Sequence, residues 1–158
     1  MQNIIKRVMI GIVLCVGPAA IIAGCASMGG ERDITLAQAS EPAQATITKE
    51  VGSGHVDKIT KEVERGKTVY DVEATVNGKH MEYLIADKDG ELLGTEVPIE
   101  FAQLPQPVQA STEKYFGTST GLTIMKGVEY GETHYEIEGM KKGKKVEVTF
   151  NPEGKKGK

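Results

Sequence analysis

Tryptophan is absent from this 158-residue chain, cysteine occurs twice, and aromatic residues make up only 5%. The two cysteines, Cys15 and Cys25, both lie near the N-terminus. Residues 26–158 therefore contain no thiol. This excludes a disulfide framework, a thiol nucleophile and a cysteine metal site from that part of the chain. We expect its fold to be held together by a hydrophobic core.

Long hydrophobic runs are also scarce, and the clearest one extends from Val8 to Ile22. It follows the basic pair Lys6 and Arg7, and it is shorter than the ~20 apolar residues that a transmembrane helix needs. A basic start, a short apolar run and small residues in this order are typical of a secretory signal peptide.

The end of this segment reads Ile22-Ala23-Gly24-Cys25 and resembles the lipobox of bacterial lipoproteins. In that family the cysteine is diacylated and becomes the first residue after cleavage. The resemblance predicts a lipoprotein signal peptide over residues 1–24 and Cys25 as the lipidation residue. The alternative is a plain signal peptide with an incidental cysteine.

A lipid anchor on Cys25 predicts a location and a first partner, because two acyl chains hold a protein stably on a membrane. Ala26 follows the cysteine, where an aspartate would resemble an inner-membrane retention signal. We therefore expect a cell-envelope protein anchored in the membrane. In a bacterium with two membranes, it would sit on the periplasmic face of the outer membrane.

Charge is unevenly distributed along the chain. Loss of residues 1–24 leaves 17 of the 19 Lys and Arg residues against all 22 Asp and Glu residues. This acidic balance argues against nucleic-acid binding. From Lys141 to Lys158, however, there are seven lysines and two glutamates. This end could contact anionic headgroups or cell-wall polymer, although residues 155–158 also fit a solvated basic tail.

Residues 42–85 and 107–150 repeat one another at a constant offset of 65, with about 16 of roughly 44 positions identical. The shared positions are mainly prolines, glycines and strand apolar residues. The candidate chemical residues described below are not repeated. The sequence therefore predicts a tandem duplication of a scaffold and argues against a twofold catalytic or metal site.

Each copy predicts one helix followed by three strands. In the first copy, Ala43, Ile47 and Val51 recur at helical spacing before Gly52. Alternating apolar residues then predict strands, and Asn77-Gly78 predicts a two-residue hairpin turn. Residues 91–97 are an optional short strand before the linker.

The expected fold class is α+β: two tandem helix-plus-three-strand modules that form an antiparallel sheet covered on one face by helices. The predicted divisions are a signal peptide, a flexible tether, two modules and a basic tail. Their respective ranges are 1–24, 25–40, 41–97, 98–154 and 155–158.

Two segments resemble the PepSY-like, β-lactamase-inhibitor-protein-like domains of bacterial envelope proteins. The first reads PAQATITKEVGSGHVDKITKEVERGKTVYDVEATVNGKHMEYLIADKDGEL, and the second runs from Leu104 to Lys155. The resemblance covers most of residues 40–155. It implies a non-catalytic module that binds an extracellular protein or inhibits a peptidase.

Residues that could act in catalysis or bind a metal do not form a recognisable motif. His55, His80 and His134 fall in different predicted elements and lack metal-ligand spacing. The segment Asp87–Glu91 matches only a fragment of a calcium loop and fits a strand turn better. Ser53, Ser111 and Ser119 lack a nucleophile motif. We therefore predict no catalytic residue, no metal site and no cofactor, and the sequence identifies no binding residues.

Three functions are consistent with these features. The first is a binding or inhibitory lipoprotein with an envelope protein as its partner. The second is a structural envelope lipoprotein that contacts the cell wall through its lysine-rich end. The third is a hydrolytic enzyme or small-ligand carrier, which would need a pocket with converging polar groups. The absence of a catalytic set favours the first.

Overall fold

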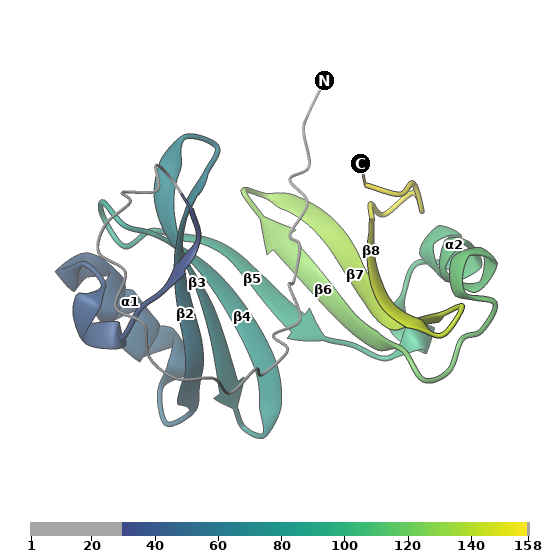
Figure 1. Ribbon diagram of the computed structural model, residues 1–158, viewed down its shortest axis with the longest axis horizontal. Coiled ribbons are helices and arrows are strands. Elements are labelled where there is room, and N and C mark those ends of the chain that lie inside the picture. The colour runs from purple at the N-terminus through teal and green to yellow at the C-terminus, as the bar shows by residue number, and fades with distance from the viewer. Residues whose placement is uncertain (1–29, 158) are drawn as a thin grey trace, which may run out of the picture.

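The computed structural model describes residues 30–157, which form an antiparallel sheet with two α-helices (Figure 1). The predicted signal peptide, Cys25 and the first residues of the predicted tether lie outside the described residues. Within the described range, neither helix has the length and apolar character needed to cross a membrane.

The order of elements is regular. The chain runs through β1 (Arg32–Asp33), the 3-10 helix η1 (Leu36–Gln38), α1 (Glu41–Val51), β2 (His55–Glu64), β3 (Lys67–Val76), β4 (Lys79–Ala86), β5 (Leu92–Pro98), the 3-10 helix η2 (Phe101–Gln103), α2 (Gln106–Phe116), β6 (Thr123–Glu129), β7 (Glu132–Lys141) and β8 (Lys144–Phe150). Each strand pairs with its neighbours in chain order.

The predicted fold class of two helix-plus-three-strand modules is wrong. The strands form one continuous eight-stranded sheet, and strand dominates over helix in the described residues. The physical reason is β5, which the sequence marked only as an optional strand. It pairs with β4 on one side and with β6 on the other. An unpaired strand edge exposes backbone hydrogen-bonding groups. β5 pairs with the free edges of β4 and β6 and thereby joins the two predicted modules into one sheet.

Both α-helices lie on the same face of this sheet. The cross-strand pairs Tyr83–Thr95, Thr95–Val128 and Val128–Thr133 place these four residues on one side. Tyr83 packs near α1, and Ile137, on the same side of β7 as Thr133, belongs to the core below α2. Figure 1 accordingly shows the helices at the two outer flanks of the molecule.

Two hydrophobic cores fill the space between the helices and the sheet. The first includes Ile47 of α1 together with Tyr70, Val72 and Ile85. The second includes Val108 of α2 together with Ile137. The apolar residues predicted to alternate on one face of the second and third strands of the first copy are the ones that line its core. The predicted alternation in these strands is therefore confirmed.

The offset of 65 recurs in the bounds of several elements. It relates α1 to α2, η1 to η2 and β3 to β7. The predicted Asn77-Gly78 turn joins β3 to β4 with φ of 52° and 74°, and Lys142-Gly143 repeats it with 51° and 75°. Positive φ at both central residues is the signature of the hairpin turn that matches strand twist.

The segments predicted as tether and basic tail take part in the fold where they are described. Arg32 and Asp33 pair with β2, and Ala39 is buried against the first core. At the other end, Lys156 forms an isolated bridge with Phe150, and its Nζ lies 4.7 Å from the ring centre of Tyr115. The backbone of both described ends therefore pairs with the sheet, while the side chains of Arg32, Asp33, Lys155 and Lys156 stay exposed.

Thr112 of α2 occupies the position that Ile47 occupies in α1, at the same offset of 65. It is fully buried, and its Oγ1 has no hydrogen-bond partner among the described residues. A buried hydroxyl without a partner costs about 1–3 kcal/mol.

We expect Thr112→Val to raise the free energy of unfolding by about 1 kcal/mol, measured by urea denaturation. Thr46→Val, which removes a hydroxyl that donates to the Gly90 carbonyl at 2.7 Å, should lower it. Equal effects of the two changes would contradict this assignment.

Candidate functional site: the acidic face of the sheet

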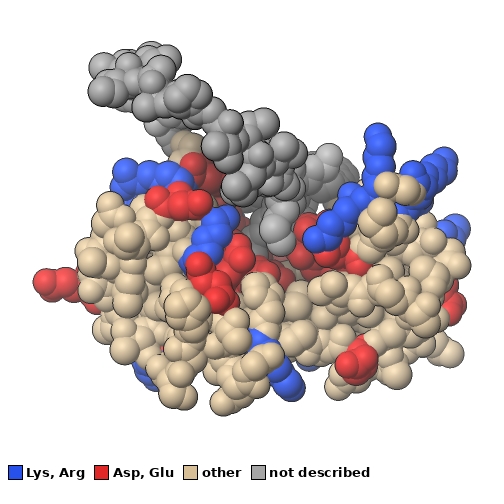
Figure 2. Space-filling view, turned by 60° about the horizontal axis from the view of Figure 1, so that its bottom comes forward, with Lys and Arg blue, Asp and Glu red and all other residues tan. Residues whose placement is uncertain are grey.

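The face of the sheet opposite the helices is rich in carboxylates. Strand register places the following acidic residues on it: Glu62, Glu64, Asp71, Glu73, Glu82, Glu96, Glu129, Glu132, Glu136, Glu138 and Glu147. We call this side of the sheet the acidic face. Figure 2 shows Asp and Glu side chains gathered along the middle of the molecule, with Lys and Arg side chains at both flanks.

The sheet curls toward this face. The β2–β3 and β6–β7 turns are separated by four strand spacings, or about 19 Å in a flat sheet. Nevertheless, the Arg65 guanidinium lies 4.1 Å from the ring centre of Tyr130 and 3.9 Å from the Glu132 carboxylate. Burial, together with the nearby Glu64 carboxylate, raises the pKa of Tyr130 to about 12. The contact between the two turns bounds the acidic face at one end.

One row of residues crosses the centre of the acidic face. Cross-strand pairing runs from Glu82 on β4 to Glu96 on β5, then to Gly127 on β6 and His134 on β7. Glu96 is 2% exposed and Glu82 is 9% exposed. Directly opposed like charges destabilise a sheet, and buried carboxylates need compensation by positive charge or hydrogen bonds. Positive charge should therefore be favoured at this point.

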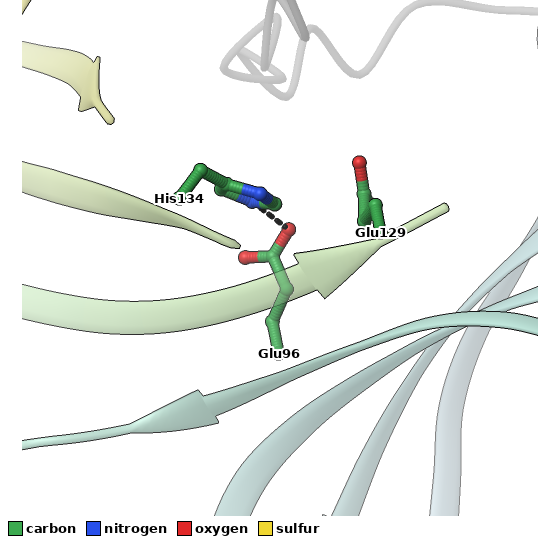
Figure 3. Close-up of side chains that lie close together, drawn as sticks. All are labelled: Glu96, Glu129 and His134. Atoms are coloured by element: carbon green, nitrogen blue, oxygen red, sulfur yellow. Dashed lines mark hydrogen bonds and ion pairs between the residues drawn. The ribbon is translucent and has the colours of Figure 1, made fainter. Parts of the chain in front are cut away.

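His134 reaches Glu96 across the strand that separates them. The His134 Nε2 atom lies 3.1 Å from Glu96 Oε1 (Figure 3). This approach depends on Gly127, because a Cβ atom built at position 127 would overlap the imidazole ring. Gly127 does not have a positive φ, so it is space rather than backbone conformation that calls for glycine here.

Glu129 completes the cluster from β6. It is paired with Gly94 of β5, and a Cβ at position 94 would lie 2.7 Å from Glu129 Cγ. One ligand atom each from Glu96, Glu129 and His134 lies within 4.8 Å of the other two. Figure 3 shows His134 and Glu96 pointing toward one another, with Glu129 standing beside them on a neighbouring strand. Two carboxylates and one imidazole can bind a cation or exchange a proton.

The structure separates the three histidines that sequence analysis considered together. His55 is exposed at the start of β2, 3.9 Å from Asp57. His80 pairs with Glu82 at 3.0 Å, and His134 lies beside Glu96. Sequence analysis missed Glu96 and Glu129, because the three residues of the cluster come from three strands. The available signal was Gly94 and Gly127, which lie inside predicted strands, since a glycine in a strand often marks the close approach of another group.

Asp87 serves the first core and the turn that follows β4. The Tyr70 hydroxyl donates a hydrogen bond to its carboxylate, and Lys61 Nζ lies 3.3 Å away. The hydrogen bond from Tyr70, helped by Lys61, lowers the pKa of Asp87. Two residues on, the Asp89 carboxylate accepts a hydrogen bond from the Glu91 amide at 3.1 Å. These contacts are those of a structured turn.

The three serines considered as nucleophiles lie apart from the cluster. Ser53 follows the C-terminal end of α1, Ser119 lies between α2 and β6, and Ser111 lies in α2. The Ser111 hydroxyl donates to the Gly154 carbonyl at 2.7 Å. Thr46, at the equivalent position of α1, donates in the same way to the Gly90 carbonyl.

Comparison with known proteins supports the fold. Neither a protein-family model nor a curated protein matches the sequence. The structure is similar to a crystal structure from Bacteroides eggerthii DSM 20697 whose printed description is "putative periplasmic proteins". The TM-score is 0.54 at 16% identity, and the match covers 75% of this chain and 85% of the other. At this identity the likeness shows a shared fold.

Proposed function

We propose that this protein is a non-catalytic binding protein of the bacterial cell envelope. It is held at a membrane by lipid on Cys25 and binds a partner protein through the acidic face. The lipobox-like segment and the fold shared with a protein described as periplasmic support the location. The observation that carries the binding role is the concentration of carboxylates on one curled face.

The charge of this face favours a partner protein that presents Lys and Arg side chains. Complementary charge speeds encounter and excludes partners of the wrong sign. The resemblance to β-lactamase-inhibitor-protein-like domains adds peptidase inhibition as one form that such binding takes. Contact with the cell wall through the C-terminal lysines is the alternative, since Lys155 and Lys156 pair through their backbone but keep exposed side chains.

A matched pair of triple variants tests the binding face. Glu73→Gln/Glu136→Gln/Glu138→Gln removes charge from the acidic face but leaves Glu96, Glu129 and His134 intact. Glu73 and Glu138 also pair within this chain, with Lys58 at 3.8 Å and Lys145 at 2.8 Å. A further ion pair with a partner contributes up to about 1 kcal/mol, so we expect affinity for a captured partner to fall about tenfold. The control Glu41→Gln/Glu113→Gln/Glu153→Gln removes the same charge outside the sheet strands and should bind normally.

The measurement is crosslinking and capture from envelope extract, followed by a binding titration of the captured partner at low and high salt. Affinity should weaken as salt screens the charges. If the partner carries no basic surface, if its binding ignores salt, or if both triple variants bind alike, the acidic face is not the binding site. Addition of the protein to a captured peptidase shows whether binding also inhibits.

A further inference from the structure

We propose that Glu96, Glu129 and His134 form a binding site for a divalent first-row transition-metal ion, with Zn²⁺ as the reference ion. The three ligand atoms lie within 4.8 Å of one another and come from three adjacent strands. Zinc binds nitrogen and carboxylate oxygen at about 2.0–2.2 Å, which places ligand atoms about 3.4 Å apart in a tetrahedral site. The Glu96–His134 pair, at 3.1 Å, already has such a spacing.

The site is built into the sheet and is more than a collection of surface carboxylates. Gly127 gives the imidazole room to lie against β6, and Gly94 gives Glu129 room to lean toward the cluster. Both glycines stand inside strands, where glycine is otherwise unfavourable. Two separate positions therefore carry the small residue that allows the ligands to converge (Figure 3).

The local electrostatics also favour a dication. Glu96 is almost completely buried, with buried Glu82 directly opposite it and Glu129 beside it. Confining several carboxylates in a poorly solvated place raises the free energy of their charged forms. A bound dication adds to the compensation that His80 and His134 already give Glu82 and Glu96.

The donor set selects the type of ion. Calcium and magnesium prefer sites made of oxygen ligands, whereas imidazole suits zinc and its first-row neighbours. Three protein ligands leave at least one coordination position for water or an incoming group, as in zinc sites that are not purely structural. The site does not depend on the proposed protein partner, because its ligands all belong to this chain.

Titration of the full chain with ZnCl₂ tests the proposal. The protein is purified in detergent, stripped with a chelator and measured by calorimetry, with CoCl₂ absorption as a second probe of coordination. We expect one ion per chain. Loss of a ligand in His134→Ala or Glu129→Gln should weaken binding by about 100-fold or more, beyond the 10- to 100-fold effect of outer-sphere changes. CaCl₂ and MgCl₂ at the same concentration should not displace zinc.

Two further variants separate the site from general effects. Gly127→Ala keeps all three ligands but displaces the imidazole, so it should also weaken zinc binding. His55→Ala removes an exposed histidine outside the cluster and should leave binding unchanged. Circular dichroism of each variant in the presence of chelator checks that the variant is folded. The proposal is overturned if the folded parent binds no zinc, or if His134→Ala and His55→Ala bind it equally.

Discussion

Replacing Ile137 with alanine is expected to lower the free energy of unfolding by about 2–5 kcal/mol, as is usual for truncation of a buried isoleucine. Ile137 is fully buried at the centre of the second core, beneath α2. Ile47 plays the same part in the first core and should show a loss of similar size. A loss this large is a substantial fraction of the 5–15 kcal/mol that stabilises a typical domain.

Urea denaturation followed by circular dichroism measures both changes. Val63 is 55% exposed on β2, so Val63→Ala serves as a control and should stay within about 0.5 kcal/mol of the parent. Because β5 and β6 join the two cores through a hydrogen-bonded ladder, we expect a single transition in every variant. Two transitions, each sensitive to only one of the isoleucine changes, would show instead that the cores unfold independently.

Replacing Cys25 with serine is expected to move nearly all of the protein from the membrane fraction to the soluble fraction. Serine cannot carry the thioether-linked lipid that the lipobox resemblance implies, and stable anchoring takes two membrane-binding signals. Fractionation of cells, followed by immunoblotting, measures the distribution.

The chain supplies its own control for this experiment. Cys15→Ser changes the other cysteine, inside the apolar run of the predicted signal peptide, and should leave the protein in the membrane fraction. Mass spectrometry of the parent should find acyl chains on Cys25. A Cys25→Ser protein that still sediments with membranes, or a parent without lipid, would rule out the anchor.

The local structure was predictable from sequence because it depends on short-range patterns. Apolar spacing located Ile47 in the buried stripe of α1, and Asn77-Gly78 located a hairpin turn. The continuity of the sheet was not predictable in the same way. It depends on β5 pairing with β6 across an intervening helix, and the sequence of β5 does not indicate which strand it will pair with.

The candidate site was hidden for the same reason. Glu96 and His134 are 38 positions apart, and no spacing rule connects them. Their proximity follows from strand register, which a single sequence does not fix. Gly94 and Gly127 were visible from the start, but a strand glycine signals only that something comes close. The identity of that neighbour appears once the strands are paired.

Glu96, Glu129 and His134 are not placed symmetrically with respect to the duplication. Glu96 precedes the second copy, while the other two residues lie inside it, where their counterparts in the first copy are Glu64 and Val69. Neither copy alone contains the triad. The cluster therefore forms only where β5, which precedes the second copy, pairs with β6 inside it.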